Sequence, residues 1–143
     1  MSHYLAELYS PKSAWLNLDA EARRQFFDGI GAGMGPLMEL GIEPLALGKV
    51  DADMLHAPTQ QFFAIWRAPD AVAMRALVDG IAASGWHDYF DTVNATGVGH
   101  DLNAHLAQLA AVWAVCRRGG MPLAKRWLLS LVVAAGGGNL LAI

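Results

Sequence analysis

The sequence has 143 residues, of which 55% are hydrophobic, a length typical of one domain with a single core. Its formal net charge is −3, and lysine and arginine are scattered through residues 1–110, which argues against nucleic acid as a partner. Cys116 is the only cysteine, which excludes an internal disulfide and a thiolate metal cluster.

The N-terminal 41 residues predict a strand followed by a helix. Residues 3–9 alternate between two faces, a pattern typical of a β-strand, and Ser10-Pro11 ends it. Asp19 is a suitable N-cap for a helix, and Gly41 occupies the position of a left-handed C-cap. The stripe expected to face the core consists of Ala22, Phe26, Ile30, Gly33, Leu37 and Leu40. Four glycines at alternate positions in 29–35 weaken this helix, and we attribute them to close packing against a sheet.

Residues 42–85 predict two strands and a second helix. The apolar run 42–50 contains Pro44 and is typical of an edge strand. Residues 61–67 give the strongest β signal, which predicts a central strand. Asp70 caps the second helix and Gly85 ends it. Its expected buried side consists of Met74, Leu77, Val78 and Ile81.

The segment 86–97 has two interpretations. Trp86, Tyr89, Phe90 and Val93 fit helical spacing, whereas the composition of the segment is that of a strand. We choose a strand over 89–97, because two crossover units need a fourth strand. The sequence therefore predicts an α+β, ferredoxin-like domain over 1–110 with an antiparallel sheet, in the order strand, helix, strand, strand, helix, strand.

Residues 111–143 are expected to form an extension of that domain. A third helix, capped by Asp101, is expected to end at Gly119-Gly120. The apolar stretch Trp127–Ile143 has 17 residues, which at about 1.5 Å each falls short of a hydrocarbon core of roughly 30 Å. The stretch is open to three interpretations, a membrane anchor, a pair of strands or an arm that covers a neighbouring subunit. We favour a soluble tail and expect a cytoplasmic protein, since the first residues lack a secretory signal.

Common motifs for metals and cofactors are absent. His100 and His105 are five apart, about 140° around a helix, so they do not share a metal as an i,i+4 pair would. The glycines of DGIGAGMG lie within a helix and not after a strand, which excludes a dinucleotide loop. Ser84 lacks a nucleophile elbow, and Cys116 lacks an evident base. We therefore expect no metal and no cofactor.

The segment 86–91 is the densest cluster of aromatic and titratable side chains, and it is the first candidate site. In this hypothesis acid–base groups come from His87, Asp88 and Tyr89, and an apolar wall comes from Trp66, Trp86 and Phe90. The alternative is that the aromatic residues belong to the core and that the polar ones are solvated.

A second constellation consists of His3, Glu7 and Arg67. On paired strands these side chains are expected to share one sheet face and to reach a common ligand. The alternative is an ordinary cross-strand ion pair.

Three segments, HYLAELYSP, FFAIWRAPD and GWHDYFDTVNATG, resemble an uncharacterised bacterial family of the dimeric α/β-barrel superfamily. The resemblance covers roughly residues 1–110. It implies a homodimer in which two ferredoxin-like sheets pack face to face, with a cavity between each sheet and its helices or its partner. Better-known members of the superfamily include cofactor-independent monooxygenases, muconolactone isomerases, haem-dependent enzymes and stress-responsive proteins. None of their catalytic residues can be placed on this sequence.

Together these observations predict a homodimer that binds a small apolar or aromatic molecule. It is expected to act without a cofactor, as a monooxygenase, isomerase or cyclase. Two alternatives are a non-catalytic binding or stress-response module and a haem protein.

Overall fold

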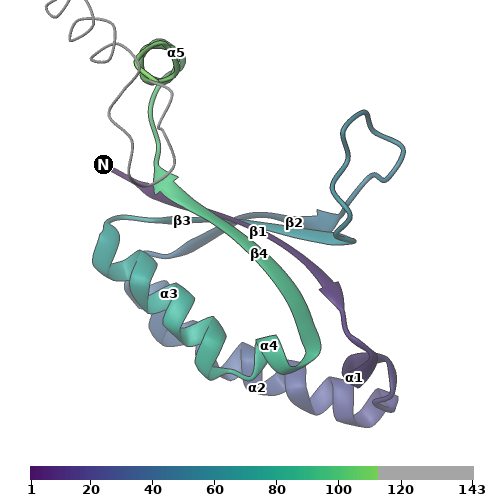
Figure 1. Cartoon of the computed structure of the whole chain (residues 1–143). Helices are drawn as coiled ribbons and strands as arrows, with labels where there is room; N and C mark the ends of the chain where they lie inside the picture. Colours follow the sequence, from purple (N-terminus) through teal and green to yellow (C-terminus); the bar gives the residue numbers. More distant parts are fainter. Residues whose placement is uncertain (113–143) are drawn as a thin grey trace, which may run out of the picture. The chain divides into compact units, whose positions relative to one another are not determined.

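The computed structural model describes residues 1–112, which fall into one unit over Met1–Gly99 and the start of a second at His100 (Figure 1). The apolar tail, Cys116 and the expected end of the third helix lie outside the described residues. Among the residues described, no helix combines the length and the apolar character needed to cross a membrane.

The Met1–Gly99 unit contains a four-stranded antiparallel sheet in the order β2-β3-β1-β4. The elements in chain order are β1 (His3–Pro11), α1 (Ser13–Leu16), α2 (Ala20–Glu39), β2 (Glu43–Lys49), β3 (Phe62–Ala68), α3 (Ala71–Ala83), α4 (Trp86–Tyr89) and β4 (Phe90–Val98). The second unit begins with α5 (Leu102–Ala110). This architecture confirms the predicted α+β, ferredoxin-like class, with β2 at an edge and β3 in the interior of the sheet.

The helix boundaries follow from local capping chemistry. The carboxylates of Asp19, Asp70 and Asp101 each accept a hydrogen bond of 2.8 Å from the backbone N–H three residues later. These bonds satisfy amides that the first turn of a helix leaves without a partner. Gly41 and Gly85 have φ angles of +80° and +81°, the left-handed conformation that glycine adopts at low cost. All three predicted N-caps are confirmed.

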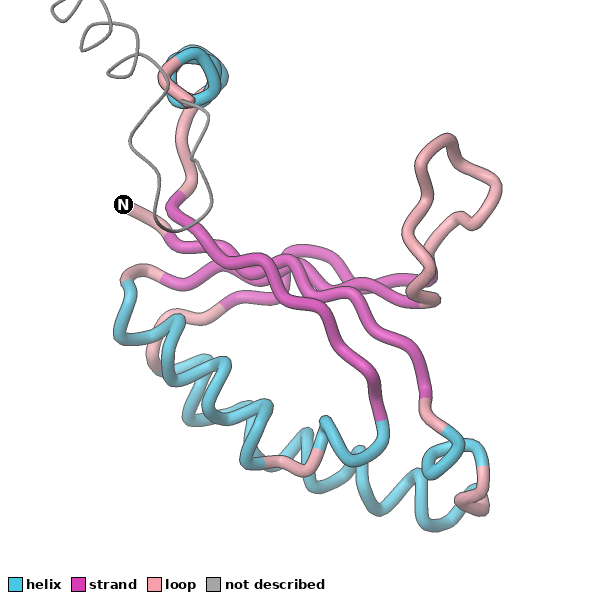
Figure 2. The backbone as a smooth tube through the Cα atoms, viewed as in Figure 1, coloured by secondary structure: helices cyan, strands magenta, loops and turns pink. Residues whose placement is uncertain are grey.

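The sheet has one face covered by helices and one that is not. Leu5 pairs with Trp66 on the side where α2 and α3 lie, and the core forms there (Figure 2). The buried residues of that core are Leu5, Ile42, Ala64, Trp66, Ala68, Ala73, Met74 and Leu77. No helix of the Met1–Gly99 unit covers the other side, here called the open face (Figure 1). The open face presents Tyr4, Ala6, Leu8, Phe63, Ile65, Arg67, Val93 and Ala95.

Two expectations about α2 were wrong. An ideal Cβ at any of the four glycines in 29–35 meets nothing within 4 Å, so they do not serve close packing. Met34 packs against the core in place of Gly33, and Leu40 is 48% exposed. Because glycine has no side chain to bury, the helix turns its neighbouring methionine inward.

The ambiguous segment 86–97 contains both structures that its pattern indicated. Residues 86–89 form one helical turn, α4, and β4 starts at Phe90, one residue after the predicted strand. The helical spacing of the aromatic residues was therefore real at the start of the segment.

Gly41 and Gly33 provide a matched test of these backbone conformations. Gly41→Ala should lower the free energy of unfolding by about 1–2 kcal/mol, because φ is +80° and Pro69 Cγ lies 3.3 Å from the new Cβ. Gly33→Ala should raise it by about 0.5–1 kcal/mol, because the site is helical and open. Urea denaturation of both variants measures the difference, and a stabilised Gly41→Ala protein would contradict this account.

Candidate functional site

Aromatic rings fill the end of the unit where α4 leads into β4. Trp86 stacks on Phe90 with a centroid distance of 4.1 Å, and Tyr9 meets the Trp86 ring edge-on at 5.1 Å. Trp15 of α1 adds a contact of 4.9 Å to Phe90. The rings within stacking or edge-on distance are Tyr9, Trp15, Phe26, Phe27, Phe62, Trp86, Tyr89 and Phe90, here called the aromatic cluster. Such contacts favour tight packing at this end.

The predicted acid–base groups lie on the outside of the aromatic cluster. His87 and Asp88 are exposed, and Tyr89 is half-buried with its ring 5.0 Å from that of Phe26. Lys12 holds α4 in place, since its Nζ donates to the His87 carbonyl at 2.5 Å and its backbone N–H donates to the Tyr89 carbonyl at 2.8 Å. The catalytic role of these three residues stays a prediction.

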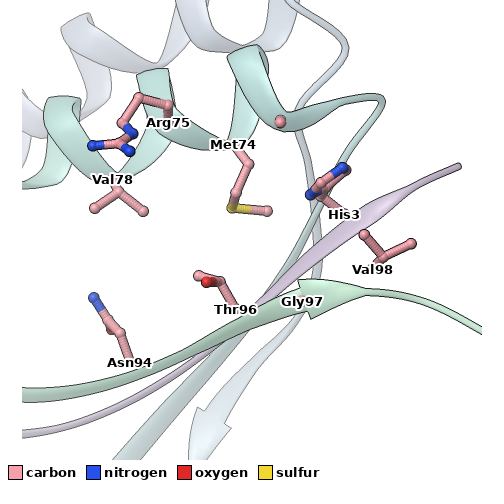
Figure 3. Close-up of a pocket in the computed structure, with 9 residues that line it drawn as sticks. His3, Met74, Arg75, Val78, Asn94, Thr96, Gly97 and Val98 are labelled. Atoms are coloured by element: carbon pink, nitrogen blue, oxygen red, sulfur yellow. The ribbon is translucent and has the colours of Figure 1, made fainter. Parts of the chain in front are cut away.

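A groove of about 480 Å³ lies between α3 and β4 (Figure 3). Its lining residues are His3, Ala71, Met74, Arg75, Val78, Asn94, Thr96, Gly97 and Val98. None of them comes from the segment 86–91, and His3 is the one predicted site residue among them. The groove thus lies toward the opposite end of β4 from α4.

The groove combines an apolar floor with a few polar side chains. Met74 and Val78 of α3 face it together with Val98, and Arg75, Asn94, Thr96 and His3 supply donors and acceptors (Figure 3). Among residues 1–112, Arg75 is exposed and forms no salt bridge. An apolar surface with a few polar groups is the usual composition of a site for a small molecule.

Glu7 is a buried carboxyl in the middle of the sheet. It is 3% exposed, faces the helices and pairs with Ala64 on one side and Asn94 on the other. Burial raises its pKa above the ordinary value, because a charged carboxylate loses its hydration there. The neighbouring Trp66 indole partly offsets this rise in pKa. The pKa of Tyr9 is also raised. Burial of Tyr9 is the larger cause, and the negative charge of Glu7 is the second.

Several polar side-chain atoms of the described residues are buried without a hydrogen-bond partner. Within the described part of the chain these include Glu7 Oε1, Trp66 Nε1, Trp86 Nε1 and Thr92 Oγ1. The Trp66 indole lies beside the carboxyl and acts on the pKa of Glu7 as a hydrogen-bond donor does. A buried polar group left without a partner costs about 1–3 kcal/mol, so each of these atoms departs from ordinary packing.

Asn94 connects Glu7 with the groove. It lines the groove and is the cross-strand neighbour of Glu7, and side chains in such pairs have Cβ atoms about 5 Å apart. Thr96 and Val98 continue the same face of β4, opposite Leu5 and His3. The buried carboxyl therefore lies one strand inside the wall of the groove.

Arg67 is separated from His3 and Glu7 by the sheet. The antiparallel register pairs Arg67 with Tyr4 on the open face, whereas His3 and Glu7 face the helices. Arg67 instead forms an exposed ion pair with Glu43 of β2. The predicted three-residue constellation is thus divided, because neighbouring positions on a strand point to opposite faces.

The polar residues of the groove were missed from the sequence, although a signal for them exists. Thr92, Asn94 and Thr96 alternate along β4 on the face directed toward the helices. In a strand of an ordinary core, that face is apolar. A polar inward face next to an apolar helix is the pattern that indicates a site here.

Residues 2–112 match the model of DUF6616, a family of unknown function. The chain belongs to that family. The match confirms the predicted membership of an uncharacterised family. No curated protein matches the sequence of this DUF6616 chain.

Solved structures confirm the ferredoxin-like fold of this DUF6616 protein. A putative chlorite dismutase is 17% identical in sequence and superposes with a TM-score of 0.53. The match covers 71% of this chain and 46% of the dismutase chain. A protein of unknown function from Rhodopseudomonas palustris is 16% identical with a TM-score of 0.50. The match covers 70% of this chain and 83% of that protein. A haem-binding protein from Thermus thermophilus is 13% identical with a TM-score of 0.50. The match covers 94% of this chain and 65% of that protein. The chain therefore spans less than half of the putative chlorite dismutase, and at these identities the likeness shows the fold alone.

The buried Glu7 carboxyl predicts a dependence of stability on pH. Since the folded-state pKa is raised above the ordinary 4.5, its contribution to stability is full below that value and is lost as pH rises through the folded-state pKa. Glu7→Gln should remove this loss, by about 1.4 kcal/mol for each unit by which the pKa is raised. Urea denaturation between about pH 4 and about pH 8 compares the two proteins. Parallel curves of free energy against pH would contradict the assignment.

Proposed function

We propose that the protein is a homodimer that binds a small aromatic or otherwise apolar molecule with an acidic group in the groove between α3 and β4. The observation that supports this is the groove itself, because its volume of about 480 Å³ lies within the range of sites for small molecules. The floor formed by Met74, Val78 and Val98 suits an aromatic ring. We infer that the ring lies between the helix and the strand.

The Arg75 side chain is the reason to propose an acidic group on the ligand. Its guanidinium lines the groove and has no carboxylate partner among the described residues. Arginine binds carboxylates through two parallel hydrogen bonds, which fix orientation as well as charge. We therefore propose an aromatic carboxylate as the class of ligand, with Asn94, Thr96 and His3 as further polar contacts.

If the protein is an enzyme, we propose that it acts on the bound ligand without a cofactor. The reaction would be an oxidation, an isomerisation or a cyclisation. The Glu7 carboxyl supports it, because it is the cross-strand neighbour of the groove residue Asn94 and burial raises its pKa above the ordinary value. His87, Asp88 and Tyr89 support it less, because α4 contributes no residue to the groove. The non-catalytic form is a binding or stress-response module that uses the same groove.

Haem is a second candidate ligand, favoured by one residue of the groove. Imidazole and thioether groups bind haem iron, and the groove contains His3 and Met74. Met74 is 5% exposed within the core, which leaves the half-buried His3 as the residue that would hold the iron. The haem-binding protein from Thermus thermophilus shares the fold. A Soret shift on adding haem that is absent in His3→Ala would favour haem over a cofactor-free site.

The open face is the proposed dimer interface. It presents Ala6, Leu8, Phe63 and Ile65 from the two interior strands, and an apolar sheet face without a helix above it favours association. A second copy of the chain offers the same apolar face, so that two sheets pack symmetrically. The resemblance to the dimeric α/β-barrel superfamily leads to the same arrangement.

Binding of benzoate tests the groove. Arg75→Gln should weaken benzoate binding about tenfold or more, the loss expected when a charge-assisted hydrogen bond is removed. Amide chemical shifts of residues 94–98 in a benzoate titration measure the affinity and locate the site. Arg24→Gln removes an exposed arginine of α2 and should leave the affinity unchanged. Equal weakening in both variants, or shifts confined to the segment 86–91, would refute the proposed site.

A charge on the open face tests the dimer. Leu8→Lys should convert the dimer to a monomer, because two lysines would be buried in a symmetric interface. Met38→Lys, at a position of α2 that is 58% exposed, is the control and should remain dimeric. Sedimentation velocity distinguishes the two states. A wild-type protein that sediments as a monomer would exclude this part of the proposal.

A further inference from the structure

The lining of the groove between α3 and β4 differs in charge from the chain as a whole. The chain has 13 acidic and 10 basic residues, and its formal net charge is −3. The lining contains one arginine, Arg75, and one histidine, His3, and none of the described residues in it is an aspartate or a glutamate. Neither of the two side chains forms a salt bridge among residues 1–112. An anion in the groove therefore meets basic groups without competing carboxylates in the lining.

Arg75 and His3 approach the groove from different elements, β1 and α3. Figure 3 shows the two side chains on either side of Met74. The start of α3 is near His3, because Ala68, the register partner of His3, precedes Ala71 by three residues. Arg75 follows Ala71 by four residues, about 6 Å along the helix axis. The two basic groups are thus about one helical turn apart, which suits a benzene ring with a substituent at each end.

The charged groups around His3 come from α3. The strands β3 and β4 place the uncharged residues Ala68 and Val98 opposite His3. The helix contributes Arg75 and, at its N-cap, Asp70, whose carboxylate accepts a hydrogen bond from a backbone N–H of the first turn. A carboxylate of the ligand at this end of the groove can therefore be matched by a protonated imidazole.

The buried Glu7 carboxyl lies away from the His3 end of the groove. It faces the same side of β1 four residues later, about 13 Å along the strand, and its partner on β4 is Asn94. A second acidic group on the ligand is repelled least at the end furthest from this carboxyl. The His3 end is therefore the favourable position for that group.

We propose that the ligand of the groove is an aromatic dicarboxylic acid, with one carboxylate on Arg75, the ring against Met74 and the second carboxylate on a protonated His3. This inference rests on the proposed function, which places the ring and the first carboxylate in the groove, and it adds a second acidic group to the ligand class. Histidine is the side chain that gains and loses its charge between about pH 5 and about pH 8. The affinity for the second carboxylate consequently falls as the pH rises through that range.

Two probes of nearly the same shape test the inference. Terephthalate has two carboxylates, and 4-carbamoylbenzoate has a neutral amide in place of the second one. At about pH 6 the wild-type protein should bind terephthalate about tenfold more tightly, because only its second carboxylate forms a charge-assisted hydrogen bond with an imidazolium. At about pH 8 the two affinities should differ by about threefold or less, because a neutral imidazole offers no charge. Calorimetric titration measures both affinities at each pH.

Two histidine variants assign the difference between the probes to one side chain. His3→Gln should bring the two affinities within about threefold of each other at both pH values, because glutamine donates a hydrogen bond but carries no charge. His56→Gln replaces an exposed loop histidine outside the groove and should keep the difference and its pH dependence. The pH comparison in the wild-type protein gives the decision if His3→Gln does not fold.

The outcomes distinguish this inference from the proposed function. If benzoate binds and Arg75→Gln weakens its binding, but the two probes bind equally at about pH 6, the inference fails and the groove proposal stands. A preference for terephthalate that survives in His3→Gln, or that is the same at both pH values, also overturns the inference. If neither benzoate nor the two probes bind, both proposals fail.

Discussion

The pairing of β1 with β3 on one side and β4 on the other determines how the rest of the unit is arranged. A strand alternates its side chains between two faces, so this register sends Leu5 and Glu7 toward the helices and Leu8 toward the open face. A shift by one residue would exchange the two sets. The apolar core, the buried carboxyl and the proposed dimer interface are thus three results of one pairing.

The groove exists because the two halves of the helix-facing side differ in polarity. Toward β3 the sheet offers Ala64, Trp66 and Ala68, which pack against Met74 and Leu77 of α3 in the core. Toward β4 it offers Thr92, Asn94 and Thr96, with which an apolar helix gains little by contact. The helix therefore packs over the apolar half, and the polar edge strand is left beside open space.

Much of the fold could be predicted from the sequence, because its signals are local. The caps at Asp19, Asp70 and Asp101 act within four residues, and the alternation of residues 3–9 reports directly on strand faces. The site depends on register between distant strands, which local patterns do not specify. Arg67 was placed with His3 although the sheet separates them, and the groove residue Arg75 was not recognised because its helix position gives no sign of an open edge opposite it.

The unfilled space beside the glycines of α2 has a consequence for the dynamics of the native state. The helix has 20 residues and none of them is buried, while each of four glycines costs it roughly 1 kcal/mol of intrinsic stability. Tertiary contacts through Phe26, Met34 and Leu37 must therefore supply most of the stability of this helix. Backbone amides in the middle of α2 consequently exchange with solvent through local opening at lower free energy than those of β1 and β3, and each opening uncovers the core from the side of the helices.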